Sequence, residues 1–240
     1  MDQPIVTIIT ATTGTKYLEQ NIASVASQTY KNIQHLVVID GKHHHKKAKK
    51  YLIEDNDVLI LPYATGTEQY NGHRIYGGCT YFAKGDFIIY LDEDNWIDTN
   101  HVESLVDCVG DGWACALRKI TDMKGNYICN DDCESLGNWE SVLGDYFVDV
   151  NCFFLPKKIA LQLSQLWYRR ARHPNEQPEV DRILTYTLKH NNILCTVSGN
   201  YTVNYRAGNR EDSVKPEFFI HGNHIMEQRY NYSYPWRKSA

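Results

Sequence analysis

The sequence has 240 residues, of which 42% are hydrophobic, and a formal net charge of −4 at pH 7. A chain of this length and composition can bury a substantial core. Its charge gives no basic footprint for nucleic acid and no polybasic anchor for anionic lipid, so we expect no nucleic-acid partner.

The first residues carry no targeting pattern. Met1 is followed by Asp2, Gln3 and Pro4 rather than by basic residues. The apolar run at residues 5–9 is too short for a signal-peptide core or a membrane span. These features predict a cytoplasmic protein with no integral membrane segment.

The first half of the chain alternates expected strands with expected helices. Runs of β-branched and apolar residues predict strands at residues 5–10, 35–39, 58–61 and 87–91. Helical spacing of apolar residues predicts helices at residues 17–27, 46–53 and 75–83. Because the strands are almost continuously apolar, we expect an α/β fold with a mostly parallel central sheet flanked by helices.

The second half has a different, mixed pattern. Its expected elements are a helix at residues 99–109, an apolar segment at 113–117, a turn at 122–126, an irregular loop at 130–144, a strand at 147–155, and helices at 156–167 and 179–190. The tail from residue 216 is aromatic and weakly periodic. We expect one domain over residues 1–240, with halves at 1–110 and 111–240.

Three acidic residues directly follow the expected strand at 87–91. In an extended chain, Asp92 and Asp94 point the same way and Glu93 points away from them. Repulsion between two such carboxylates is relieved by protonating one of them or by binding a hard cation such as Mg²⁺ or Mn²⁺. Strand ends of this kind are common ligand sites in α/β sheets, although many solvated surface turns also contain two aspartates with this spacing.

The order of several segments resembles the family 2 glycosyltransferases of the GT-A fold, which is Rossmann-like. The matching segments lie at residues 5–12, 24–30 (SVASQTY), 37–41 (VVIDG) and 83–96 (AKGDFIIYLDEDNW). The resemblance spans roughly residues 4–110. It implies that residues 1–110 bind a nucleotide sugar and that residues 111–240 contact the acceptor.

The resemblance also implies roles for residues on the donor side. Asp94 would bind Mn²⁺ or Mg²⁺ directly, and Asp92 would contact the ribose or, through water, the metal. Asp40 would bind the nucleotide base in a pocket that Thr10 and Thr12 line. Arg74 would reach the base or the diphosphate. Asn95 stands where the family often has a further Asp.

The same resemblance implies an acceptor side. Asp181 takes the position of the family's catalytic base, with Glu179 as the substitute if the register differs. Asp149 and Asn151 flank a strand expected beneath the acceptor cleft, and they would orient hydroxyl groups. His221 and His224 are candidates to complete the metal site.

We therefore expect a metal-dependent, inverting glycosyltransferase that moves a sugar from a UDP- or GDP-sugar to a glycan, lipid-linked or small-molecule acceptor. The Q-x-x-R-W motif of processive synthases is missing, so a nonprocessive enzyme is predicted. The alternatives are a noncatalytic nucleotide-sugar-binding protein, a phosphatase or phosphotransferase that uses the two aspartates, and a nucleotidyltransferase.

Overall fold

The structure is a computed structural model that describes residues 3–67, 70–137, 147–169, 180–208 and 213–237. Its strands are β1 (Val6–Thr12), β2 (Ile33–Ile39), β3 (Asn56–Ile60), β4 (Phe87–Tyr90), β5 (Trp96–Ile97), β6 (Trp113–Thr121), β7 (Tyr127–Asn130), β8 (Phe153–Pro156) and β9 (Cys195–Arg206). Its α-helices are α1 (Leu18–Ala26), α2 (His45–Ala48), α3 (His73–Cys79), α4 (His101–Cys108), α5 (Lys157–Leu163), α6 (Val180–His190) and α7 (Pro216–Tyr230). Among these residues, no helix combines the length and apolar character needed to cross a membrane.

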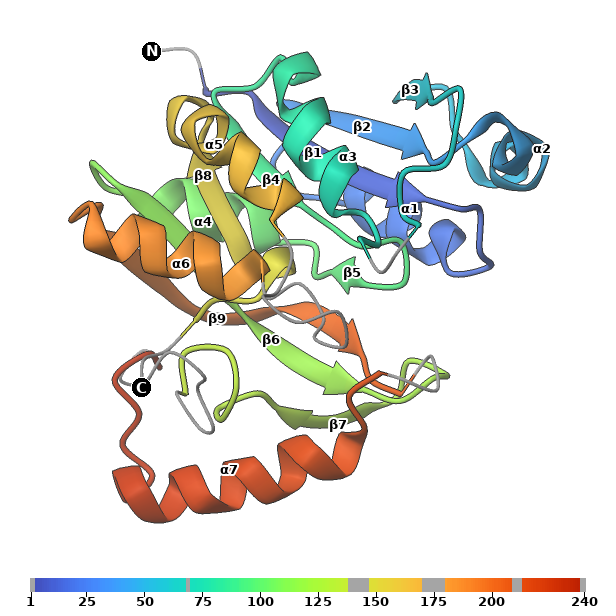
Figure 1. Cartoon of the computed structure of the whole chain (residues 1–240). Coiled ribbons are helices and arrows are strands. Elements are labelled where there is room, and N and C mark those ends of the chain that lie inside the picture. The colour runs from blue at the N-terminus through green and yellow to red at the C-terminus, as the bar shows by residue number, and fades with distance from the viewer. Residues whose placement is uncertain (1–2, 68–69, 138–146, 170–179, 209–212, 238–240) are drawn as a thin grey trace.

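The described strands form one sheet in the order β3-β2-β1-β4-β8-β6-β9-β5, with β7 paired to β6 (Figure 1). Strands β1 to β4 are parallel to one another. Strand β8 runs antiparallel to both β4 and β6, while β6 and β9 are parallel. The expected α/β architecture, with a parallel first half and a mixed second half, is therefore confirmed.

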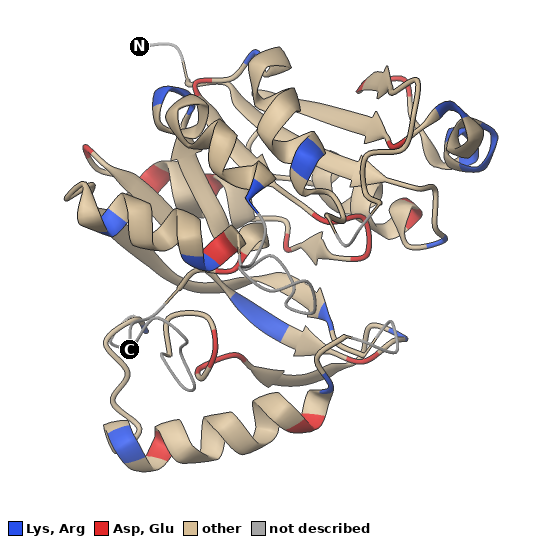
Figure 2. Cartoon of the chain, viewed as in Figure 1, with Lys and Arg blue, Asp and Glu red and all other residues tan. Residues whose placement is uncertain are grey.

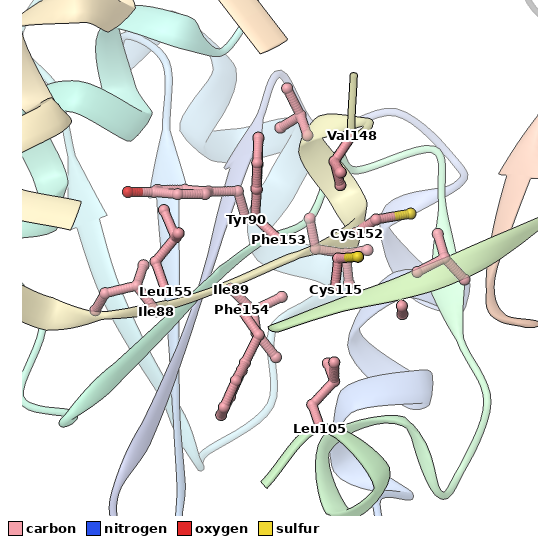
Figure 3. Packing of buried hydrophobic residues seen from close by; sticks show 14 of the residues in the cluster. Ile88, Ile89, Tyr90, Leu105, Cys115, Val148, Cys152, Phe153, Phe154 and Leu155 are labelled. Atoms are coloured by element: carbon pink, nitrogen blue, oxygen red, sulfur yellow. The ribbon is translucent and has the colours of Figure 1, made fainter. Parts of the chain in front are cut away.

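The core between the two halves is built where β4, β8 and β6 meet. Figure 3 shows Ile88 and Ile89 of β4 packed beside Phe154 of β8, with Leu105 of α4 nearby. The rings of Phe87 and Phe154 are stacked with their centroids 4.6 Å apart. Close packing of this kind holds the end of β4 in one position, because displacing buried side chains leaves voids.

Strands β5 and β9 and helix α7 were not predicted from the sequence. Helix α7 lies along the outer side of β6 and β7, at the opposite end of the molecule from α2 (Figure 1). Its buried residues are few: Phe219, Gly222 and Met226. A helix that buries so narrow a stripe gives a weak helical pattern in its sequence.

The strand predicted at residues 147–155 is shorter than expected. Val150–Cys152 forms a 3₁₀ turn, and β8 begins only at Phe153. The Asp149 carboxylate causes this change, since it accepts a hydrogen bond from the Asn151 backbone N–H at 3.0 Å and so caps the turn. The turn redirects Asp149 and Asn151 from a strand face toward the end of β4.

Candidate active site

The Asp92 carboxylate is fixed from two sides at the end of β4. Tyr76 of α3 donates a hydrogen bond from Oη to Asp92 Oδ1 at 2.7 Å, and Asn151 donates from Nδ2 to Oδ2 at 3.0 Å. Burial and the charge of Asp92 raise the pKa of Tyr76 well above its ordinary value, so the phenol remains a donor. Asp92 therefore stands between α3 and the turn before β8.

Residues 92–95 form a turn, closed by a hydrogen bond from the Asn95 N–H to the Asp92 carbonyl oxygen at 3.0 Å, and not the extended chain expected from the sequence. Glu93 of this turn contacts the loop between β1 and α1. Its carboxylate accepts hydrogen bonds from Thr12 Oγ1 at 2.6 Å, from Thr13 N at 3.1 Å and from Thr15 N at 3.0 Å. These bonds close the loop between β1 and α1. Glu93 therefore has a structural role, and Asp92 and Asp94 remain the candidate metal ligands.

Arg206 fixes the turn that carries Asp94. The partly exposed Asp94 accepts a hydrogen bond on its backbone oxygen from Arg206 Nε at 3.1 Å. Asn95 is buried, and its Oδ1 accepts from the Arg206 backbone N–H at 3.0 Å. The side chain at position 95, where the family often has Asp, therefore binds the end of β9 and is not directed at a ligand.

Asp40 and Arg74 meet at a single loop. Asp40 Oδ1 accepts from the Thr65 backbone N–H at 2.6 Å, and Oδ2 accepts from that of Gly66 at 2.9 Å. Arg74 donates from Nη1 to the Thr65 carbonyl at 3.1 Å, and its guanidinium lies 3.6 Å from the centre of the Tyr70 ring. The structure therefore joins these two predicted donor-side residues through residues 65–66.

Thr10 and Thr12 are buried within the fold. The Thr10 hydroxyl lies 3.2 Å from Asn21 Oδ1 and 3.0 Å from His35 Nε2. Burial lowers the pKa of His35 to about 3, so this imidazole is neutral. The structure does not bring the Thr10 and Thr12 hydroxyls to the face of the sheet where Tyr76 binds Asp92.

Asn151 connects the donor side to the second half of the chain. Its Nδ2 donates to Asp92 Oδ2 and to Asp149 Oδ1, each at 3.0 Å. The other oxygen of Asp149 accepts from Arg118 Nη1. A continuous series of hydrogen bonds therefore runs from Asp92 through Asn151 and Asp149 to Arg118.

Arg118 is the centre of a buried ionic cluster. Its side chain is 2% exposed and contacts the carboxylates of Asp131, Glu134 and Asp149. Burial by itself would lower the pKa of the guanidinium, but the three carboxylates raise it well above its ordinary value. Burial raises the pKa of Glu134, and Arg118 partly opposes that change. Arg182 of α6 lies 3.6 Å from Glu134, so the three carboxylates face two guanidinium groups close to the start of α6.

Asp181 lies in the first turn of α6, beside this cluster. Its side chain is 19% exposed, and its Oδ1 accepts from the Arg182 backbone N–H at 2.8 Å. Burial raises the pKa of Asp181 to about 7; Arg182 opposes this shift, while Asp149 and Glu134 add to it. A carboxyl group with such a pKa changes protonation near neutrality, as a general base requires. Glu179, the predicted substitute, falls outside the described residues.

Comparison with known proteins identifies the family. The family described as "Glycosyl transferase family 2" matches residues 6–128. The chain belongs to glycosyl transferase family 2. The matched part includes Asp40, Arg74, Asp92, Asp94 and Arg118, whereas Asp149 and Asp181 lie beyond it.

Two similar proteins are also named as glycosyltransferases. EpsH of Bacillus subtilis (strain 168), a protein named as a glycosyltransferase, is 26% identical over 117 residues, 46% of this chain and 32% of EpsH. "Glycosyltransferase GlyA" of Streptococcus pneumoniae serotype 4 (strain ATCC BAA-334 / TIGR4) is 25% identical over 158 residues, 62% of this chain and 20% of GlyA. The chain thus aligns with a third or less of the length of each relative.

A solved structure has the same fold. The crystal structure of S. aureus TarS residues 1–349 in complex with UDP-GlcNAc superposes with a TM-score of 0.60. The match covers 95% of this chain and 67% of that one, at 14% sequence identity. The expected GT-A fold is confirmed by this likeness.

The two histidines predicted for the metal site lie on α7. His221 and His224 are both exposed. His224 Nε2 lies 3.1 Å from the Gln228 side-chain nitrogen, and its Nδ1 lies 3.8 Å from a Glu227 oxygen. Within the described parts of the chain, no three His, Cys, Asp or Glu side chains are grouped to hold a metal. The structure therefore does not gather these histidines with Asp92 and Asp94.

Four residues of this family 2 site were not singled out from the sequence: Tyr76, Arg118, Glu134 and Arg206. Arg118 carries a partial signal, because it and Lys119 are the two charges inside the apolar run at residues 113–120, and a charge that is buried there needs partners. Two of its three partners, Asp131 and Glu134, lie in a segment that reads as a solvated loop, and the third is Asp149. For Tyr76 and Arg206 we find no sequence signal.

Proposed function

We propose that this chain is a metal-dependent, inverting glycosyltransferase that transfers a sugar from a nucleoside diphosphate sugar to a hydroxyl acceptor. Membership of glycosyl transferase family 2 supports the class of reaction. A UDP-sugar is the favoured donor, because TarS, which shares the fold, is described in complexes with UDP-GlcNAc and with UDP.

The observation that carries the proposal is the connection between Asp181 and Asp92. Arg182 contacts Asp181 Oδ1 at 3.5 Å and Glu134 Oε1 at 3.6 Å, and Arg118 joins Glu134 to Asp149. Asn151 then hydrogen-bonds both Asp149 and Asp92. Groups on the donor side and a titratable carboxylate on the acceptor side are thereby held in one polar network. Sugar transfer needs both, since a base must take the proton of the attacking hydroxyl while the diphosphate leaves.

In this reaction Asp181 accepts the proton of the acceptor hydroxyl. Burial holds its pKa at about 7, so near neutrality the carboxylate is available and is still basic enough to take a proton. Arg182 contacts Asp181 Oδ1 at 3.5 Å and limits the rise in pKa. Asp149 and Asn151 line the acceptor side in this proposal. Through its hydrogen bonds to both carboxylates, Asn151 also keeps Asp92 oriented.

The residues at the end of β4 fit a hard divalent cation. Asp94 is partly exposed, and Asp92 is pre-oriented by Tyr76 and Asn151, so each can offer carboxylate oxygen. Mg²⁺ and Mn²⁺ use one or two carboxylates and complete their shell with phosphate oxygens and water. When bound, such an ion would neutralise charge on the departing diphosphate. That His221 or His224 completes the metal site stays a prediction.

Asp40 and Arg74 are proposed to hold the nucleotide. Asp40 Oδ2 has a single protein donor among the described residues, the Gly66 N–H, so it can accept another hydrogen bond from a base. Gly66 has no room for a side chain, because an added Cβ would lie 2.6 Å from the Asn71 carbonyl oxygen and 2.9 Å from Asp40 Oδ2. The loop at residues 65–66 is thus shaped around the Asp40 carboxylate.

Thermal unfolding with a panel of nucleotide sugars tests the proposal. We expect stabilisation of roughly 2–4 kcal/mol by a saturating UDP- or GDP-sugar with Mn²⁺, and its loss on adding a chelator. Asp94→Ala should weaken this metal-dependent binding, while Asp111→Ala, a change at an exposed carboxylate elsewhere, should not. No response to any nucleotide sugar would contradict the proposal.

A further inference from the structure

A strongly basic segment lies beside the donor side and takes no part in the site described above. Residues 42–50 contain five lysines, three histidines and no acidic residue. All five lysines are exposed. Figure 2 shows this positive charge gathered on the helical segment around α2, at one side of the molecule.

The backbone of the basic segment is anchored, so its lysines are held outward. Ala48 is buried in a small core with Leu18, Ile22 and Ile39. Gly14 has no room for a side chain, because an added Cβ would lie 2.6 Å from the Ala48 backbone nitrogen. The segment therefore packs with its apolar side on α1 and β2 and presents its charged side to solvent.

Exposed apolar side chains border the lysines on the same side of the sheet. Val58 and Ile60 of β3 are 41% and 37% exposed, and Ile60 pairs with Ile39 in parallel register. Paired residues of neighbouring strands point to the same face, and Ile39 packs against Ala48. Ile53, which is 42% exposed, lies three residues after Lys50. The result is a polybasic strip with an apolar border.

Nearby acidic groups do not neutralise this strip. The carboxylates of Asp40 and Glu93 are hydrogen-bonded to residues 65–66 and 12–15, and within the basic segment their charge acts on His44, not on a lysine with which they form an ion pair. Asp57 pairs with Lys84 at 2.7 Å. Glu54 and Asp55 are exposed and lie between Ile53 and β3, so their charge is at the apolar border and not among the lysines. In the described residues no ion pair includes a lysine of residues 42–50.

We propose that this strip, residues 42–50 with Ile53, Val58 and Ile60, docks the protein on the surface of an anionic lipid bilayer. Clusters of four to eight basic residues bind anionic headgroups, and neighbouring apolar side chains enter the interfacial region. A soluble polyanion would satisfy the lysines but gain nothing from the exposed isoleucines and valine. The inference is independent of the proposed reaction, since no residue of the strip is assigned to catalysis.

Docking in this way would bring the donor side close to the bilayer. The basic segment begins two residues after Asp40, and β2 ends at Ile39. The ends of the parallel strands and the surface of the membrane would then lie on the same side of the protein. A net charge of −4 hides this capacity, because the positive charge is concentrated on one segment.

Vesicle co-sedimentation at physiological ionic strength tests the inference. We expect the protein to bind vesicles that mix phosphatidylglycerol with phosphatidylcholine, and not vesicles of phosphatidylcholine alone. The triple variant K46E/K47E/K49E should bind the anionic vesicles at least about 100-fold more weakly. The control K31E/K124E/K158E makes the same change in net charge at exposed lysines elsewhere and should keep the binding.

Ile53→Ser separates a lipid surface from a soluble polyanion. It should weaken vesicle binding several-fold but leave binding to inorganic polyphosphate unchanged. Equal binding to both kinds of vesicle, no vesicle binding, or binding to polyphosphate alone would overturn the inference. The thermal shift with nucleotide sugar should be the same in K46E/K47E/K49E and the parent. A failure of the membrane-docking inference is therefore distinguishable from a failure of the proposed glycosyltransferase function.

Discussion

Asn151 holds Asp92 at two points. Its Nδ2 donates to Asp92 Oδ2 at 3.0 Å, and its Oδ1 accepts from the Asp92 backbone N–H at 2.7 Å. The same Nδ2 reaches Asp149 Oδ1 at 3.0 Å. A buried amide that joins the end of β4 to the turn before β8 fixes both carboxylates, because moving either one would leave a polar group without its partner.

Replacing this amide should affect both stability and donor binding. Asn151→Ala removes an acceptor from the Asp92 N–H and a donor from two carboxylates, which should cost about 1–3 kcal/mol of unfolding free energy. Donor affinity should fall as Asp92 loses its orientation. Urea unfolding and nucleotide-sugar titration measure the two effects. The exposed Asn191→Ala serves as the control, and equal stability of both variants would contradict the assigned role.

Asp181→Asn should abolish sugar transfer without weakening donor binding. An amide at this position can still accept the hydrogen bond from the Arg182 N–H but cannot take a proton from the acceptor. Loss of a general base lowers the rate by roughly 10²–10⁴-fold. Single-turnover transfer and nucleotide-sugar titration provide the measurements. Near-normal turnover in this variant would show that another group is the base.

The rate of transfer should rise with pH and level off above neutrality. Burial raises the pKa of Asp181 to about 7, and only the deprotonated form is a base, so activity is lost as the pH falls below that value. Glu134→Gln removes a negative charge that raises this pKa, and it should shift the rise to lower pH. Measuring kcat as a function of pH for the parent protein and for Glu134→Gln tests both the rise and its shift. An unshifted midpoint would mean that Glu134 does not act on Asp181.

Arg118→Met should destabilise the protein strongly, and more so at high pH. The variant leaves the carboxylates of Asp131, Glu134 and Asp149 without their shared cation, which typically costs about 3–5 kcal/mol. Without that cation the carboxyl pKa values rise in the folded state, so stability is retained at low pH, where they are protonated, and lost as they ionise. Chemical unfolding at pH 5 and pH 8 measures the difference. If the loss of unfolding free energy in Arg118→Met were the same at pH 5 and pH 8, the assigned role of Arg118 would be contradicted.

The first half of the fold is well predicted by the sequence, whereas much of the second half is not. Strands β1, β2 and β4 are buried on both faces and rich in β-branched and other apolar residues, and therefore give a strong local signal. Strand β9 mixes Thr, Asn and Tyr with few aliphatic residues, and it is only partly buried. Its pairing with β6 arises from tertiary contacts that no local pattern reveals.

The site shows the same division. The acidic residues at the end of β4 are read directly from the sequence, but the directions of their side chains are not, because residues 92–95 form a turn and not an extended chain. The roles of Tyr76 and Arg206 depend on bringing α3 and β9 to the end of β4, which is a property of the whole fold. Arg118 shows an intermediate case, because the apolar run around it is evident from sequence but its burial and its three partners are not.

The most direct test is a crystal structure of the protein grown with Mn²⁺ and UDP-GlcNAc. We predict an anomalous manganese signal beside Asp94, with the diphosphate against the end of β4 and the uracil near Asp40. Nucleotide sugar bound elsewhere, or bound at this end of the sheet with the metal away from both Asp92 and Asp94, would contradict the proposed chemistry.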